Sequence, residues 1–272
     1  MTPPPTLAPS RPRWDWYAAT IPLVSPEEII DSLSADLDGE PRATNPLLGY
    51  RSAVEIRSDD RRTALVLWGG HNPDVHAVSS GQDAEPFAAA LRSLTLRHRV
   101  SRADVCVDID APGAFETLST ALRAVALQSG LSMQLISDPD RPERGRTLYV
   151  GSRKSRGFVR LYEKGRKDDP TRPDWVRFEV EIKPNEPDLR AHLSALAPVD
   201  ALGMVRWVRA FVGDQFDFAA AAAPVRLPNV ADDDRSMQAM LNQYGRLLRR
   251  AAQRTGGWEA LGADLGRRLN GE

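Results

Sequence analysis

Short stretches in which apolar and polar residues alternate recur between Trp14 and Lys183, and amphipathic helical stretches separate them. A period of two residues is typical of β-strands and a period of 3.6 residues is typical of helices. The predicted strands cover residues 14–21, 50–58, 63–70, 74–80, 102–110, 132–137, 146–152, 157–164 and 175–183. The predicted helices between them cover residues 25–37, 83–94 and 112–127. The same order, a strand, a helix and then further strands, therefore occurs twice.

This order predicts an α+β fold with an antiparallel sheet core of β-α-β-β units and with helices on one face. The recurring order suggests that the unit is duplicated, although no sequence repeat supports this. The sequence becomes helical after Pro187, which predicts a C-terminal helical part. The expected organisation is a disordered proline-rich tail at 1–13, a main domain at 14–218, a linker at 219–230 and a helical segment at 231–272.

Composition excludes several classes of protein. The 272 residues are 42% hydrophobic, enough to bury a core, but no apolar run approaches the roughly 20 residues that a membrane span needs. The single cysteine, Cys106, cannot form an internal disulfide or a cysteine-based zinc site, so any metal would have oxygen or histidine ligands. The N-terminus lacks the apolar centre of a secretory signal, so we expect a cytoplasmic protein without membrane contact.

Positive charge is concentrated in one segment, although the net charge of the chain is −1. Between Arg141 and Asp174 there are eleven Lys and Arg residues against five Asp and Glu residues. A local basic patch can bind phosphates whatever the overall charge, which makes this segment a candidate nucleic-acid surface. The alternative is an ordinary solvated face.

Two predicted strands carry carboxylates on one face. Alternation places Asp104 and Asp108 together on the strand at 102–110, and Glu179 and Glu181 together on the strand at 175–183. Asp104 and Asp108 stand roughly 13 Å apart, from a rise of about 3.3 Å per residue, so each needs partners from another strand. If the two strands are adjacent, these carboxylates can form an oxygen-ligand site for Mg²⁺ or Mn²⁺. The alternative is that both are simply half-exposed strands.

One tyrosine, Tyr162, lies inside the basic segment. Alternation along residues 158–164 places it on one face with Arg160 and Lys164. Neighbouring cations favour the phenolate, the form that attacks phosphorus, and these cations together with Arg153 and Lys154 can hold DNA phosphates. The alternative is a tyrosine that packs its ring while the basic neighbours stay in water.

Several of these stretches together resemble the replication initiation factor family. This family includes rolling-circle initiators of plasmids and filamentous phages and the relaxases of some conjugative elements. The resemblance runs from about Trp14 to about Phe211, and its most specific part is the series Tyr-x-Gly-Ser-Arg-x-Ser, Arg-x-Tyr-x-Lys and Arg-x-Glu-x-Glu. The stretches that carry it are residues 14–21, 75–87, 102–110, 147–167 and 175–183.

The resemblance implies a function and a set of site residues. The tyrosine of Arg-x-Tyr-x-Lys is the nicking nucleophile of the family, which corresponds to Tyr162. Acidic residues on neighbouring strands bind the divalent metal, in place of the histidine pair of related HUH nickases, and these correspond to Asp104, Asp108, Glu179 and Glu181. The protein would nick single-stranded or extruded origin DNA, form a 5′-phosphotyrosyl intermediate and start rolling-circle replication. A host helicase, a polymerase and a second copy of the chain, in a homodimer, are the further partners expected.

Two other functions fit the same residues. The tripeptide Glu181-Ile182-Lys183 matches the Glu-x-Lys half of a metal-dependent hydrolytic nuclease, in which Lys183 would orient a water and Tyr162 would be dispensable. The second is a noncatalytic DNA-binding regulator that has the fold of the initiators. A covalent adduct between the protein and DNA distinguishes nicking from both.

Overall fold

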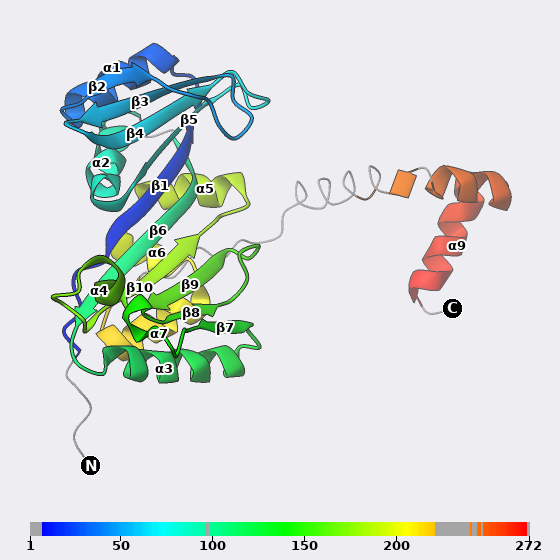
Figure 1. Cartoon of the computed structure of the whole chain (residues 1–272). Helices are drawn as coiled ribbons and strands as arrows, with labels where there is room; N and C mark the ends of the chain where they lie inside the picture. Colours follow the sequence, from blue (N-terminus) through cyan, green and yellow to red (C-terminus); the bar gives the residue numbers. More distant parts are fainter. Residues whose placement is uncertain (1–6, 96–97, 221–239, 241–243, 246, 271–272) are drawn as a thin grey trace. The chain divides into compact units, whose positions relative to one another are not determined.

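The computed structural model describes residues 7–95, 98–220, 240, 244–245 and 247–270 (Figure 1). The chain divides into two compact units, Met1–Ala223 and Pro224–Glu272, and each is described by itself. The first unit contains a ten-stranded antiparallel sheet with helices, which confirms the predicted α+β class. None of the described helices is both long enough and apolar enough to cross a membrane.

The strands of the sheet lie in the order β2-β3-β4-β5-β1-β6-β10-β9-β8-β7. Their bounds are β1 Arg13–Ile21, β2 Glu40–Ala43, β3 Ser52–Ser58, β4 Arg61–Trp68, β5 Val75–Ser80, β6 Arg99–Asp110, β7 Met133–Ile136, β8 Thr147–Val150, β9 Gly157–Tyr162 and β10 Trp175–Ile182. The helices of this unit are α1 Pro26–Asp36, α2 Ala84–Leu94, α3 Ala114–Gln128, α4 Lys164–Asp168, α5 Pro187–Ala195, α6 Pro198–Leu202 and α7 Arg206–Phe216. Two short 3₁₀ turns, Gly81–Asp83 and Pro142–Arg144, precede α2 and β8.

The sheet repeats one topology twice, as the order of predicted elements suggests. In the first half β1 is followed by α1 and four strands, the last of which, β5, pairs with β1. In the second half β6 is followed by α3 and four strands, the last of which, β10, pairs with β6. The two halves join where β1 pairs with β6 at the centre of the sheet. We call them the N-terminal half (β1–β5) and the C-terminal half (β6–β10).

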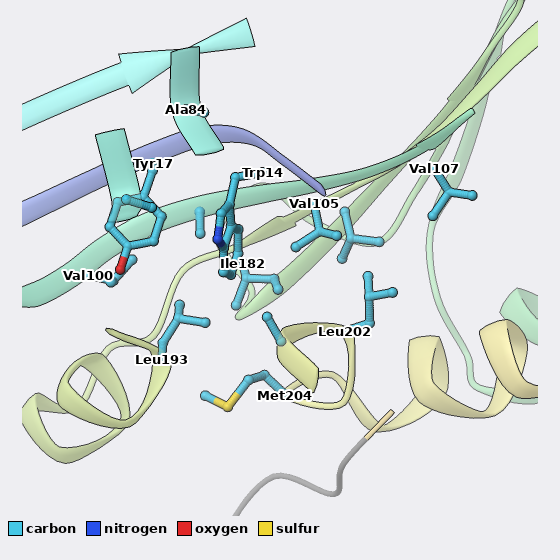
Figure 2. Close-up of a cluster of buried hydrophobic side chains, with 14 of the residues drawn as sticks. Trp14, Tyr17, Ala84, Val100, Val105, Val107, Ile182, Leu193, Leu202 and Met204 are labelled. Carbon is cyan, nitrogen blue, oxygen red and sulfur yellow. The ribbon is translucent and has the colours of Figure 1, made fainter. Parts of the chain in front are cut away.

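The main hydrophobic core lies between one face of the sheet and the helices. Figure 2 shows side chains of β1, β6 and β10, such as Trp14, Val105 and Ile182, facing Leu193 of α5 and Leu202 of α6. These strand residues are the apolar members of the alternating patterns, so period-two alternation directs them towards the helices. The polar members of β6, β9 and β10 therefore lie on the opposite face, which we call the open face.

Local chemistry accounts for where elements begin and end. Helix α1 starts where the Ser25 hydroxyl accepts a hydrogen bond from the Glu28 amide at 3.1 Å, with Pro26 in the first turn. Helix α6 ends at Leu202, and its C-cap, Gly203, separates it from α7. Strand β2 carries no sequence signal because Glu40–Ala43 is exposed throughout and has no alternation; it pairs with β3 through its backbone.

The predicted domain boundaries fall partly on residues outside the described ones. Within the expected tail, Pro9 forms a β-bridge with Ile109, and the Ser10 amide donates to the Asp108 carbonyl at 2.8 Å. The expected linker lies outside the described residues from 221 onwards. In the second unit, residues 247–255 are helical and α9 spans Trp258–Asn270, in agreement with the helices expected there. The boundaries at 13, 218 and 230 stay predictions.

Candidate active site

Strand pairing brings the acidic strands and the tyrosine strand side by side. Strand β10 lies between β6 and β9, and its register places Glu181 opposite Asp104 and Arg177 opposite Asp108. On the other side, Glu179 lies opposite Arg160. All of these side chains share the open face, so the adjacency that the carboxylate site requires is present.

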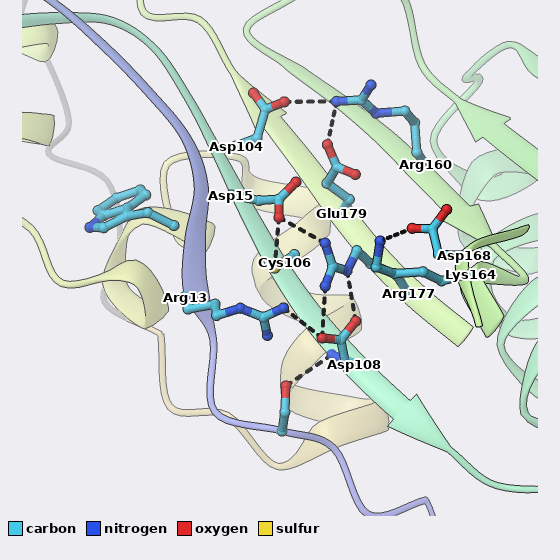
Figure 3. A network of polar contacts seen from close by, with 12 residues as sticks. Arg13, Asp15, Asp104, Cys106, Asp108, Arg160, Lys164, Asp168, Arg177 and Glu179 are labelled. Atoms are coloured by element: carbon cyan, nitrogen blue, oxygen red, sulfur yellow. Dashed lines mark hydrogen bonds and ion pairs between the residues drawn. The ribbon is translucent and has the colours of Figure 1, made fainter. Parts of the chain in front are cut away.

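The first group of charges surrounds Arg160, as Figure 3 shows. Its Nη2 atom donates to Asp104 Oδ2 at 2.7 Å and also contacts Glu179. Arg102 lies on the other side, with its Nη2 atom 2.6 Å from Asp104 Oδ2 and 3.1 Å from Glu181 Oε2. The three carboxylates are at most 5% exposed, so each depends on these arginines to offset the cost of burying its charge. We call Asp104, Glu179 and Glu181 the carboxylate cluster.

Asp108 belongs to a separate group, in the lower part of Figure 3. Arg177 binds it through two hydrogen bonds, of 2.7 and 2.9 Å, and Arg13 adds a third of 2.7 Å. Burial alone would raise the pKa of Asp108, but the hydrogen bonds and charges of these arginines outweigh it and the pKa is lowered. Asp108 is thus a firmly ionised partner of Arg177, away from the carboxylate cluster that the sequence analysis grouped it with.

The Tyr162 hydroxyl donates a hydrogen bond to Glu179 Oε2 at 3.2 Å. Burial raises the pKa of Tyr162 well above its usual value of 10, and the negative charge of Glu179 raises it further. The expectation that neighbouring cations favour the phenolate is therefore wrong for this structure, because Arg160 is engaged by carboxylates and does not bond to the phenol. The phenol is held protonated, with its proton directed at a carboxylate.

Glu179 has the properties of a proton acceptor. Burial raises its pKa to about 7; Arg160 opposes the shift, and the charges of Asp104 and Asp15 add to it. A carboxyl that titrates near neutral pH can take a proton from a neighbouring group and release it again. The hydrogen bond from Tyr162 identifies the proton that it would take.

Asp15 is part of this site, and sequence reasoning missed it. The pairing of β1 with β6 shifts register between Trp14 and Trp16, so Asp15 occupies a β-bulge. Its Oδ1 atom accepts a hydrogen bond of 2.7 Å from Arg177 Nη1, and Cys106 Sγ lies 3.8 Å away. Strict alternation would place Asp15 on the helical face together with the core residue Tyr17, and no sequence signal marks the bulge.

The predicted DNA-binding residues divide into two pairs. Arg153 and Lys154 are exposed in the turn between β8 and β9, where they are free to meet a ligand. Arg160 is held within the carboxylate cluster. Lys164 does not share a strand face with Tyr162, because β9 ends at Tyr162 and Lys164 begins α4.

A close contact follows the end of β9. Gly165 packs so closely that a Cβ atom there would lie 1.7 Å from the Arg172 carbonyl oxygen. The chain turns into α4 at this contact, and Lys164 pairs with Asp168 and lies 5.1 Å from the centre of the Trp175 ring. Lys164 is therefore placed against α4 and Trp175 and does not flank the phenol.

The donor chemistry of the carboxylate cluster fits a hard divalent cation. Its three members converge on Arg160 Nη2. The most distant of them, Glu181, has its Oε2 atom 3.8 Å from this nitrogen. Carboxylate oxygens are the ligands that Mg²⁺ and Mn²⁺ prefer. Across the described residues, however, no set of three His, Cys, Asp or Glu side chains is arranged as a metal site. Arginines and Lys183 neutralise the cluster instead.

Comparison with known proteins gives two similarities. Residues 116–223 match the family model described as replication initiation factor. The structure of a rolling circle replication initiator protein from Geobacillus stearothermophilus is similar with a TM-score of 0.54 and 18% identity, over 79% of this chain and 99% of that chain. No curated protein matches the sequence. The family match includes Tyr162, Glu179 and Glu181 and begins after Asp104. Residues 116–223 are thus similar to the replication initiation factor family, and the fold is similar to that of a rolling-circle replication initiator.

Proposed function

We propose that the protein starts rolling-circle replication by nicking one strand of origin DNA with Tyr162 as the nucleophile. The observation that carries the proposal is the hydrogen bond from the Tyr162 hydroxyl to Glu179, a buried carboxyl with a pKa of about 7. A nucleophile within hydrogen-bond reach of a matched base is the arrangement that transesterification needs. The family match of residues 116–223 associates the same segment with replication initiation.

The chemistry follows from this pair. Glu179 takes the phenolic proton as the Tyr162 oxygen attacks the scissile phosphorus, and the bond from phosphorus to the 3′ oxygen breaks. The leaving oxygen takes up a proton and becomes the 3′-OH that primes synthesis, while the 5′ phosphate stays on the tyrosine. One phosphodiester replaces another, so the reverse attack by a 3′-OH rejoins strands without ATP.

We infer that Asp104 and Glu181 would hold a divalent metal ion, Mg²⁺ or Mn²⁺, and that Glu179 beside them would stay free to act as the base. Such an ion, when bound, polarises the phosphodiester and stabilises the charge that develops on its oxygens. Asp108 would not be a ligand, because the pairing of β6 with β10 places it opposite Arg177, whereas Asp104 lies opposite Glu181. Its part is to hold Arg177, which also binds Asp15 beside the tyrosine.

A second feature of the C-terminal half supports DNA binding beside the tyrosine. A pocket of about 550 Å³ is lined by residues that include Tyr149, Arg153 and Phe158. The Tyr149 and Phe158 rings stack with centroids 5.6 Å apart, and the Arg153 guanidinium lies 5.3 Å from the Phe158 ring centre. Stacked aromatic rings beside an arginine suit a base and its phosphate, and Lys154 on the same turn adds positive charge.

The decisive experiment looks for a covalent adduct. Single-stranded DNA that contains the replication origin of the protein's own element is labelled at its 3′ end, because the 5′ phosphate of the downstream fragment would carry the protein. With Mn²⁺ or Mg²⁺, we expect a labelled band at the mass of protein plus DNA on a denaturing gel. Tyr162→Phe should abolish this band, and Tyr244→Phe, at an exposed tyrosine of the second unit, should retain it.

The other outcomes contradict the proposal in different ways. Cleavage that persists in Tyr162→Phe, without an adduct, indicates hydrolysis by a Glu-x-Lys nuclease. Binding without cleavage, with either metal, indicates a DNA-binding regulator. An adduct that persists in Tyr162→Phe and maps to another residue identifies a different nucleophile.

The role of Glu179 has its own signature in the pH profile. Since its pKa is about 7, we expect the rate of adduct formation to rise with pH up to about 7 and then to level off. Glu179→Gln should slow the reaction by about 10²- to 10⁴-fold at pH 8 and remove this rise. A profile of the wild type that is flat from pH 5 to 8 would rule out Glu179 as the base.

A further inference from the structure

A second concave site lies on the open face of the N-terminal half. It is a groove of about 510 Å³ whose lining comes largely from β1, β4 and β5 and includes Trp16, Leu65, His76 and Val78. Arg62 and Arg102 are the two arginines of the lining, and none of the described residues that line it is a carboxylate. The groove is thus apolar and aromatic in its walls and positive in its charge.

The flat side chains in and beside the groove are stacked. The Arg102 guanidinium lies 4.6 Å from the centre of the Trp16 ring. The rings of Tyr50 and His76 stack with centroids 5.9 Å apart and an angle of 13° between them. Burial lowers the pKa of His76, so its ring is neutral at physiological pH. Aromatic rings and guanidinium planes of this kind are the surfaces on which unpaired bases stack.

The groove is continuous with the candidate active site. Arg102 lines the groove and also forms ion pairs with Asp104 and Glu181 of the carboxylate cluster. Trp16 is the register partner of Asp104 in the pairing of β1 with β6. A strand of DNA bound at the carboxylate cluster would therefore lie next to this groove.

We propose that this groove binds unstacked bases of single-stranded DNA next to the nicked phosphate. The inference rests on the proposed function, since it assumes that the substrate is single-stranded DNA. Base faces would stack on Trp16 and the Arg102 plane, and Arg62 would meet the adjoining phosphates. The Tyr149 and Phe158 rings offer a comparable surface in the other half, so bases would be held on both sides of the reacting phosphate.

The test compares two oligonucleotides with the same number of phosphates. Binding of fluorescein-labelled dT20 and of an abasic 20-mer is measured by anisotropy without metal, so that no strand is cut. We expect the wild type to prefer dT20. Trp16→Leu, which keeps an apolar side chain but removes the aromatic face, should bind dT20 about 5- to 100-fold more weakly and bind the abasic strand unchanged. Leu127→Ala, at an exposed leucine of α3, is the control and should match the wild type.

Two results would overturn the proposal. One is a Trp16→Leu variant that binds dT20 as tightly as the wild type does. This result would mean that the groove does not bind bases and would favour a protein partner instead. The other is an equal loss for both strands, which would indicate phosphate contacts or a damaged fold. Wild-type protein crosslinked by light to 5-iododeoxyuridine oligonucleotides avoids the folding question: we expect crosslinks in peptides that contain Trp16 or His76, and crosslinks found only outside β1, β4 and β5 would contradict the groove.

Failure of the groove and failure of the nicking proposal are distinguishable. An adduct at Tyr162 with no role for Trp16 would refute the groove alone. Base-dependent binding through Trp16 with no adduct would refute nicking alone.

Discussion

The two halves of the sheet share one topology and differ in what their open faces carry. In the C-terminal half, the central strands β6 and β10 present buried carboxylates and arginines, and β9 presents Tyr162. In the N-terminal half, the corresponding strands β1, β5 and β4 present Trp16, His76 and Leu65, with no carboxylate among the described residues of the groove that they form. The helical faces of both halves are apolar and join one core.

This difference shows where function resides in a duplicated scaffold. The residues that make the fold are the apolar members of each alternating strand, and both halves have them. The residues that make a site are the other members of the same strands, which are free to differ because they do not contact the helices. One half has a centre of paired carboxylates and arginines suited to chemistry, and the other an aromatic surface without carboxylates in its groove, suited to bases.

The largest expected effect comes from removing an arginine from the charged half. Arg177→Met leaves Asp15 and Asp108, both largely buried, without their main partner, which should lower the free energy of unfolding by about 3–5 kcal/mol. Arg61→Met in the N-terminal half removes an arginine that is 52% exposed and leaves one buried carboxylate, Asp83, without this partner, so it should cost less, about 1–3 kcal/mol. Urea denaturation measures both, and equal losses would contradict the contrast between the halves.

An effect of intermediate size concerns pH. The pKa of Glu179 is about 7 in the folded protein and about 4.5 when unfolded, so the folded state binds more protons between these values. The contribution of Glu179 to the free energy of unfolding is fully present below pH 4.5. As pH rises from 4.5 through 7 this contribution is lost, and the free energy of unfolding falls by up to about 3 kcal/mol.

Comparison with Glu179→Gln isolates this contribution, because the histidines titrate alike in both proteins. We expect the variant to gain stability relative to the wild type as pH rises from 5 to 8. Urea denaturation across this range measures the difference, and a constant difference would show that Glu179 does not titrate there.

The smallest expected effect comes from a glutamate of the N-terminal half. Glu55 forms one ion pair of 3.3 Å with Arg57 on its own strand, so Glu55→Gln should change the free energy of unfolding by less than about 1 kcal/mol. The same denaturation series measures it. A loss comparable to that of Arg177→Met would mean that the open face of the N-terminal half also depends on charge.

Periodicity is enough to predict much of the fold. Alternation identifies the faces of β6, β9 and β10 correctly, because each strand is regular over the residues that matter. Strand β10 pairs with β6, which lies far from it in the sequence. The sequence therefore indicates which carboxylates face the open side of the sheet, but not which side chains lie next to them.

The errors have local physical causes. Periodicity misses Asp15 because a bulge rotates it onto the open face, and bulges leave no periodic trace. Alternation extends the strand to Lys164, but β9 ends at Tyr162 and Lys164 begins α4, a change that the alternation does not mark. The raised pKa of Tyr162 depends on burial and on Glu179, neither of which can be read from the cations beside it in the sequence.

The central pairing of β1 with β6 has a consequence for synthesis of the chain on the ribosome. All strands of the N-terminal half precede β6, so that half can assemble its sheet while β6 is still being made. During this interval one side of β1 is an unpaired edge, a template for pairing with any other strand. The arrival of β6 closes that edge and, in the same step, places Asp104 beside Trp16. Closing of the β1 edge and joining of the two surfaces are therefore a single folding event.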